Sequence, residues 1–302
     1  MLTAWSSAAY TIPLPAGHRF PIEKYALLRH RVLSEGVIRS ENLHVPQRVS
    51  AADVLRVHTS EYVASFDAGT LTPAAQRRMG FPWSPELVER AYRAVGGTVE
   101  AAHSALDLGM TMNLAGGTHH AFADRGEGFC VFNDVAIAVR ALQHGARIRR
   151  AAIIDLDVHQ GNGTHAIFAG DRDVYTFSMH GRRNFPFEKI PGSLDVELED
   201  GITDDIYLEM LSEHLPRVLH AARPDLVCYL AGADPHEGDA LGRLRLTLDG
   251  LARRDAMVLD ACREVGLPVV ITIAGGYGRD IATTVEAHLN TARVARRALL
   301  RA

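Results

Sequence analysis

The sequence predicts an α/β protein: a single open, mostly parallel β-sheet flanked by helices. From residue 84 onward, short apolar runs of strand length alternate with stretches of helical pattern, the order expected when crossover helices join parallel strands. The clearest runs are apolar or β-branched throughout, which is typical of strands buried on both faces. No linker or internal repeat divides the 302 residues, so one domain over 1–302 is expected.

The first 80 residues give the weaker patterns. Prolines at Pro13–Pro15 and Pro46 indicate loops, and a helix is expected near 51–66. The next helix is clearer, because Ser84–Glu86 combines an N-cap, a proline at the first helical position and an acid in the first turn. This helix should end at Gly109, since glycine favours the conformation that follows a helix.

Strands and helices then alternate to the end of the chain. Asn133-Asp134 opens a helix that ends near Gly145. The expected buried strands are Ala151–Ile154, Val174–Phe177, Leu226–Leu230 and Val269–Ile273. Helical patterns separate them near 205–221, 247–265 and 280–300. This alternation is the basis of the parallel-sheet prediction.

Composition excludes several classes of protein. The chain is 47% hydrophobic, enough to bury a large core, so disordered and fibrous classes are excluded. It carries 32 Lys+Arg against 36 Asp+Glu, a net charge of −4. Nucleic acid is therefore not an expected partner, because binding to it draws most of its affinity from basic groups that neutralise phosphates.

Cysteine and lysine usage bears on the compartment and the source. The three cysteines, Cys130, Cys228 and Cys262, have neither disulfide-framework nor CxxC spacing, which favours a reducing cytoplasm. Neither a signal-peptide pattern nor an apolar run of about 18 residues occurs, so no membrane is expected as a partner. Only Lys24 and Lys189 are lysines and alanine is abundant, a bias suggestive of a GC-rich bacterial genome.

A metal site is predicted at the end of one strand. Asp155, Asp157 and His159 alternate just where the strand over 151–154 should finish, so in an extended segment they point to one face. The alternative is a structural polar ladder. Metal binding is favoured over it, because two acids and an imidazole packed together repel and are poorly solvated without a cation.

Other strands deliver polar groups to the same edge. Ser178–His180, Asp234 and Ala274–Tyr277 each follow a predicted strand. Ligands of open α/β sheets bind outside the carboxyl ends of the strands, so these groups should share one site. Asp157, His159 and Asp234 then form a three-ligand oxygen and nitrogen set with a position left for water, as catalytic zinc requires.

Two adjacent histidines provide candidate acid and base groups. His119 and His120 lie between the glycine-rich segments Gly116–Gly117 and Gly126–Gly128. A lone histidine is usually structural. A tandem pair in a glycine-rich turn, beside a predicted metal, is better interpreted as general acid and base machinery.

The motifs resemble those of a known family. In family order they are Gly116-Gly117-Thr118-His119-His120, Gly128-Phe129-Cys130-Val131-Phe132-Asn133-Asp134, Asp155-Leu156-Asp157-Val158-His159-Gln160-Gly161-Asn162-Gly163-Thr164, Ala231-Gly232-Ala233-Asp234 and Gly275-Gly276-Tyr277. Together they resemble the zinc-dependent histone deacetylase family of the arginase/deacetylase superfamily. The segments His18–Tyr25 and His159–Asn162 resemble its class IV branch and bacterial relatives.

The resemblance implies roles for the catalytic residues. Asp157, His159 and Asp234 would be the metal ligands, His120 the general base and His119 its electrostatic assistant. The Tyr277 hydroxyl would polarise the substrate carbonyl, and Asp155 would orient His119. Asn162 replaces the aspartate that partners His120 in class I, so the pKa of His120 should be lower than in that class.

The resemblance also implies a substrate channel and a second cation. Gly128 and Phe129 would form one wall of an acyl-lysine channel. Phe185, Phe187 and Ile190 supply apolar groups where the channel should continue, unless the two phenylalanines only anchor their loop. A monovalent cation, K⁺ by expectation, would bind near Asp155, Asp157, His159, Ser178 and Met179.

The predicted activity is metal-assisted hydrolysis of an acylated lysine side chain, in which a water activated by Zn²⁺, or by Fe²⁺, attacks the amide. The acyl group is acetyl or longer. One alternative is a deacetylase of polyamines or of another small acylated amine, since such a site serves both kinds of substrate. The other is a catalytically silent module that binds acyl-lysine.

Overall fold

The computed structural model describes residues 1–301, and its centre is one eight-stranded sheet. The strand order is β2-β1-β3-β8-β7-β4-β5-β6, and every neighbouring pair is parallel. The α/β class and the open parallel sheet are therefore confirmed. Among these residues, no helix has the length and apolar composition needed to cross a bilayer.

The strands differ in how far they are buried. Their bounds are β1 Thr3–Trp5, β2 Leu43–His44, β3 Met110–Asn113, β4 Ala151–Asp155, β5 Val174–Gly181, β6 Leu194–Leu198, β7 Leu226–Leu230 and β8 Val269–Thr272. The central strands β3, β4, β7 and β8 are buried at every position, which explains why three of them stand out in the sequence as apolar runs. Strand β5 is longer than predicted, because pairing with β6 continues it through Ser178–Gly181.

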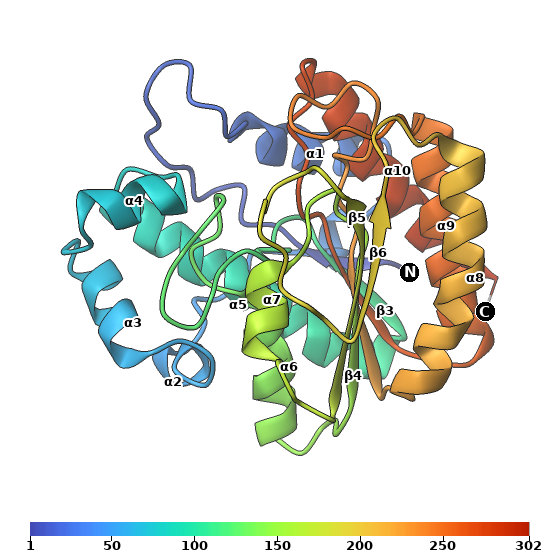
Figure 1. The fold of residues 1–302 in the computed structure, drawn as a ribbon, viewed down its shortest axis with the longest axis horizontal. Helices are drawn as coiled ribbons and strands as arrows, with labels where there is room; N and C mark the ends of the chain where they lie inside the picture. The colour runs from blue at the N-terminus through green and yellow to red at the C-terminus, as the bar shows by residue number, and fades with distance from the viewer. Residues whose placement is uncertain (302) are drawn as a thin grey trace.

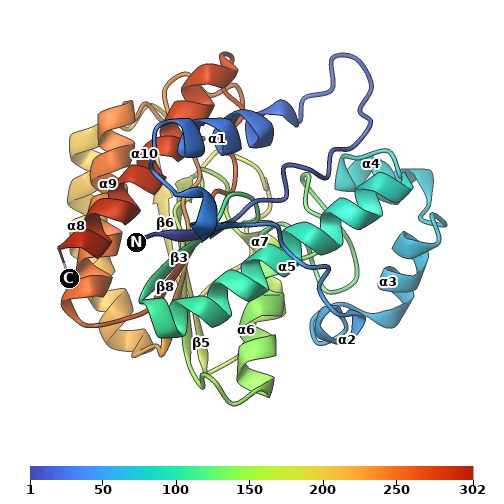
Figure 2. The same ribbon diagram turned by 180° about the vertical axis from the view of Figure 1, so that it is seen from behind.

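Helices cover both faces of the sheet. They are α1 Glu23–Ser34, α2 Ala51–Val54, α3 Ser60–Asp67, α4 Pro73–Met79, α5 Pro85–Leu108, α6 Asp134–His144, α7 Asn162–Ile167, α8 Asp204–Ala222, α9 Leu248–Glu264 and α10 Ile281–Leu300, with a 3₁₀ turn at Ser40–Asn42. Helices α8, α9 and α10 lie on one face and α5 and α6 on the other (Figures 1 and 2). Each face buries its own hydrophobic cluster.

The single helix predicted near 51–66 is wrong. The segment forms α2 and α3, separated at Leu55–Thr59. Thr59 begins α3 as an extended N-cap whose side chain accepts a hydrogen bond from the Tyr62 amide. The buried His58 ring accepts a bond from the Asn133 amide, so a tertiary contact holds the break open.

The order of strands places the polar loops together. Strand β7 lies between β4 and β8, so the segments that leave these three strands are neighbours at one edge of the sheet. Backbone hydrogen bonds fix them: the Leu156 amide donates to Leu230, and the Ala233 amide to Gly275. The loops that carry Asp157, Asp234 and Tyr277 therefore meet.

Candidate metal centre and active site

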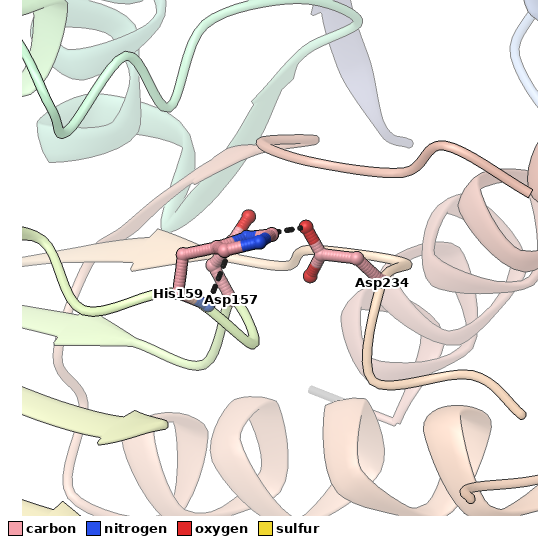
Figure 3. A group of neighbouring side chains, drawn as sticks. All are labelled: Asp157, His159 and Asp234. Carbon is pink, nitrogen blue, oxygen red and sulfur yellow. Dashed lines mark hydrogen bonds and ion pairs between the residues drawn. The ribbon is translucent and has the colours of Figure 1, made fainter. Parts of the chain in front are cut away.

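The residues Asp157, His159 and Asp234, called the metal trio below, converge at this edge of the sheet (Figure 3). His159 Nδ1 lies 2.9 Å from Asp157 Oδ1 and 3.3 Å from Asp234 Oδ2. The three side chains are buried, and their potential ligand atoms all lie within 4.8 Å of one another. This is a ligand set drawn from two separate strand ends.

The charges of the metal trio fit a divalent cation. Burial and repulsion by Asp157 raise the pKa of Asp234 to about 7. Burial opposes charge on His159, yet its hydrogen bond to Asp157 and the negative charge of both carboxylates outweigh burial and raise the imidazole pKa to about 10. Asp234 Oδ2 is buried without a hydrogen-bond partner. Two carboxylates and one imidazole suit Zn²⁺ or Fe²⁺, which would take the place of the bound protons.

Position 275 must be a glycine, because the carboxylates of Asp157 and Asp234 lie so close to its backbone. Its amide donates a 2.7 Å hydrogen bond to Asp157 Oδ2. A Cβ at this position would lie 1.9 Å from Asp234 Oδ2, a distance that no real contact tolerates. The first glycine of the sequence motif Gly275-Gly276-Tyr277 therefore makes room for the metal trio.

The two adjacent histidines lie in different electrostatic environments. His119 Nδ1 is 2.6 Å from Asp155 Oδ2, and His120 Nδ1 is 2.7 Å from Asn162 Oδ1. Burial opposes charge on His119, but Asp155 and Asp157 raise its pKa to about 9. Burial, His119 and His159 hold the pKa of His120 well below its ordinary value. The surroundings thus favour the charged form of His119 and the neutral form of His120.

The neutral tautomer of His120 follows from its partner. The carbonyl oxygen of Asn162 accepts a hydrogen bond, so Nδ1 carries the proton and Nε2 keeps its lone pair. Asn162 in turn donates to Glu127 Oε1 at 3.4 Å, which orients the amide. His120 can therefore accept a proton at Nε2.

A buried carboxylate that the sequence motifs left without a role fixes the turn before these histidines. Asp134 accepts hydrogen bonds from the Gly117 amide, from the Thr118 amide and hydroxyl, and from the Thr98 hydroxyl. From the sequence, Asp134 was predicted only to begin a helix. Nothing in its position after Asn133 indicated that it would also hold the turn before the two histidines.

Tyr277 lies in the same cavity as the histidines and the metal trio. Its amide donates a 2.7 Å hydrogen bond to Asp239 Oδ2, and its carbonyl accepts from Ala240. Burial raises the pKa of the Tyr277 hydroxyl well above its ordinary value, so the group remains a donor at any physiological pH. Asp239 is a positioning residue that the sequence did not reveal.

The predicted channel residues differ in their placement. The cavity has a volume of about 460 Å³, and Gly128, Phe129, Phe185 and Phe187 line it. Phe129 has a left-handed backbone with φ 64°, and Phe185 packs edge-on against His120. Phe187 is 87% exposed, so it lies at the rim rather than in a wall. Ile190 is not among the lining residues; its carbonyl accepts hydrogen bonds from Gln160 and His165 instead.

The residues expected at a monovalent cation share Asp157 and His159 with the metal trio, and the other three lie on β4 and β5. Asp155 pairs with Ser178 in register across β4 and β5, and Met179 follows in β5. The Asp157 amide donates to Asp155 Oδ1 at 3.1 Å. Ser178 Oγ is 2.9 Å from His180 Nδ1, so this hydroxyl already has one partner.

A buried ion pair on α9 connects the loops of the metal trio. Arg254 Nη1 donates to the Gly232 carbonyl at 2.7 Å and to the Leu156 carbonyl at 3.2 Å. The guanidinium also donates twice to Asp255 Oδ1. Asp255 accepts further bonds from the Tyr229 and Thr291 hydroxyls.

Replacing Arg254 with methionine should destabilise the protein by about 3 kcal/mol or more, because Asp255 then stays buried without a counter-charge. Urea unfolding measures the effect. The control is Arg253→Met, a neighbour on α9 whose side chain is 52% exposed; it should change stability by less than about 0.5 kcal/mol. Equal losses in the two variants would show that the buried pair has no special role.

Replacing Asn162 with aspartate should raise the pKa of His120, because a carboxylate stabilises imidazolium more than an amide does. Activity that needs neutral His120 is lost as pH falls through this pKa, so the acidic limb of kcat/KM should move to higher pH. Asn290→Asp, on α10 and outside the cavity, is the control. A limb that stays in place would show that another group sets it.

Comparison with known proteins adds an independent finding. A family model described as histone deacetylase domain matches residues 18–292. An uncharacterised protein of Picosynechococcus sp. is 48% identical over 95% of this chain and 96% of its own length. Histone deacetylase 2 of Arabidopsis thaliana is 34% identical over 89% of this chain and 73% of that protein. The crystal structure of an HDAC homolog from Aquifex aeolicus has a TM-score of 0.85 at 23% identity, covering 98% of this chain and 84% of that one.

Proposed function

This chain belongs to the histone deacetylase family, and from that premise we propose that it is a metal-dependent amidohydrolase that removes acyl groups from lysine side chains. One observation carries the proposal. The metal trio, both histidines of the pair and Tyr277 all line a single cavity. A module that only binds acyl-lysine needs neither a general base nor an oxyanion donor beside the metal ligands.

The chemistry divides among these residues. A divalent cation held by the metal trio would supply Lewis acidity, which polarises an amide carbonyl and brings the pKa of a water to about 7. His120 accepts the proton of the attacking water at Nε2 and later delivers a proton to the leaving amine. The His119 imidazolium stabilises negative charge nearby, and the Tyr277 hydroxyl donates to the developing oxyanion.

The mouth of the cavity favours acyl-lysine over an acylated polyamine. Arg19, Arg183 and Arg243 line it, and Asp157 and Asp234 are the only carboxylates among the described lining residues. Asp200 pairs with both Arg243 and Arg183, so it offsets only part of this positive charge. A polyamine carries further ammonium groups, which arginines repel and which find no free carboxylate here.

Finer features of the proposal depend on the same residues. The acyl group is acetyl or longer, because each methylene buried in an apolar cavity adds about 0.8 kcal/mol of binding. Zn²⁺ or Fe²⁺ is the catalytic ion, and K⁺ occupies the second site. The His18–Tyr25 segment supports a class IV-like enzyme of bacterial type. The three free, buried cysteines support a cytoplasmic location, and one catalytic domain spans 1–302.

Turnover of an acetyl-lysine peptide beside N-acetylspermidine, with metal content measured on the same sample, tests this proposal. We expect kcat/KM for the peptide to exceed that for the polyamine at least 10-fold. A higher kcat/KM for the polyamine would show that the enzyme acts on small acylated amines instead of acyl-lysine. If metal-loaded protein binds the peptide tightly but turns over neither substrate, the protein is a binding module and not an enzyme.

A further inference from the structure

The lining of the cavity includes a buried inner part on α5. Leu87, Arg90, Ala91, Ala94 and Val95 of α5 line this inner part. Tyr25 and the turn Gly116–Thr118, which precedes the two histidines, also line the cavity. An acyl chain whose carbonyl lies at the metal trio would extend into this space. Its walls are apolar apart from one charged side chain.

That charged side chain, Arg90, is only 6% exposed and has no carboxylate partner within the described chain. Its Nη1 donates to the Tyr10 carbonyl at 2.7 Å and to the Ser7 carbonyl at 3.3 Å. The guanidinium carbon lies 4.2 Å from the centroid of the Tyr25 ring. The neighbouring Arg93 differs, since its Nε is 2.7 Å from Glu89 Oε1.

A second buried basic side chain lies near the same ring. Lys24 is 1% exposed, and its Nζ is 5.3 Å from the ring centroids of both Tyr25 and Tyr277. Its nearest acceptors are the Gly276 carbonyl at 3.3 Å and the Ala274 carbonyl at 3.5 Å. Two buried cations without a carboxylate make this region attractive to an anion.

Arg90 retains unused donors. A guanidinium has five N–H donors in a planar fork, and the hydrogen bonds found in residues 1–301 use Nη1 alone. Burying a charge without a partner costs several kcal/mol, so a leucine or methionine would suit this apolar wall better unless an anion binds. The free part of the fork matches a carboxylate, which accepts two parallel hydrogen bonds.

We propose that Arg90 anchors an anion subsite at the inner end of the cavity and binds a terminal carboxylate carried by the acyl group. The proposal rests on the deacylase function and narrows its substrate class to lysines with a dicarboxylic acyl chain, of the succinyl to adipoyl kind. Ala91, Ala94 and Val95 contact the methylenes between the two carbonyl carbons. In the reaction the water oxygen bonds to the acyl carbon, the C–N bond breaks, and the lysine nitrogen takes a proton as the dicarboxylate leaves.

The test uses peptides that differ only in the acyl group, in matched pairs: succinyl with butyryl, glutaryl with pentanoyl, and adipoyl with hexanoyl. We expect kcat/KM for the carboxylated member to exceed that of its partner at least 10-fold in one or more pairs. Arg90→Gln keeps a donor for the Tyr10 carbonyl but removes the charge. The ratio of kcat/KM for the carboxylated peptide to kcat/KM for its uncharged partner should therefore fall at least 10-fold. Arg90→Lys should restore part of it.

Arg93→Gln is the matched control, because Arg93 lies on the same helix, pairs with Glu89 and does not line the cavity. Its ratio should equal that of the wild type. A purely structural Arg90 would lower activity on both members of a pair equally. Wild-type ratios below one in every pair, or a ratio unchanged by Arg90→Gln, would overturn the anion subsite.

A binding measurement separates this proposal from the proposed function. Acetyl-lysine turnover without any preference for carboxylated chains would overturn the subsite and keep the deacylase. If no acyl-lysine reacts, titration with glutarate against pentanoate decides the matter. Tighter binding of glutarate that Arg90→Gln abolishes supports the subsite, and equal binding by both proteins refutes it.

Discussion

Replacing Asp234 with alanine is expected to abolish turnover and to leave the purified protein without stoichiometric metal. Asp234 Oδ2 faces His159 Nδ1 at 3.3 Å and has no hydrogen-bond partner, so its place in the structure is explained by a cation. Catalytic zinc sites typically use three protein ligands, and two of them hold the ion poorly. Elemental analysis and kcat/KM on the same sample measure both effects.

Two further variants make this result interpretable. Asp234→Asn keeps the size of the side chain and an oxygen that can accept from the Val158 amide, so the fold should survive while metal affinity falls. Asp249→Ala, in the exposed first turn of α9, removes a carboxylate far from the site and should change nothing. Stoichiometric metal of unchanged affinity in Asp234→Ala would contradict the ligand assignment.

Replacing Tyr277 with phenylalanine should lower kcat by about 100-fold to 1000-fold, the usual effect of removing one oxyanion donor. KM and metal content should remain close to those of the wild type, because the hydroxyl acts mainly on the transition state. The ring should stay in place, since its contacts with Phe129 and Phe20 do not involve the hydroxyl. The Asp239 hydrogen bond to the Tyr277 amide is also retained.

Tyr175→Phe provides the control, because it removes a hydroxyl from β5 outside the cavity. Its kcat should equal that of the wild type. If Tyr277 only packs over the glycine turn, Tyr277→Phe would likewise show a nearly normal kcat. That result would remove the oxyanion donor from the mechanism.

The parts of the fold that the sequence predicted are those set by local patterns. Buried central strands such as β4 and β7 carry uninterrupted apolar runs. Helix α5 is bounded by two residues typical of helix ends, the N-cap Ser84 and the C-terminal Gly109. Strands β1 and β2 have three and two residues, too few for any periodicity to show. These two strands form because neighbouring strands of the sheet supply their hydrogen-bond partners.

The same distinction applies to the site. The metal trio was predictable because its members directly follow strands, and the order of strands brings those ends together. Asp134, Asp239 and Arg254 were not predicted, since each acts on the backbone of a loop that is distant in sequence. Arg90 is similar: the loop that buries it lies 80 and 83 residues earlier. Such contacts leave no local signal.

Metal titration of the stripped protein tests the central claim most directly. The protein is freed of metal with a chelator, and Zn²⁺ is returned in small steps while hydrolysis of an acyl-lysine peptide is followed. Metal-dependent hydrolysis at the metal trio predicts no turnover in the stripped protein, and a rate that rises linearly and stops at one equivalent. Full activity without metal, or a rate indifferent to added Zn²⁺ and Fe²⁺, would contradict it.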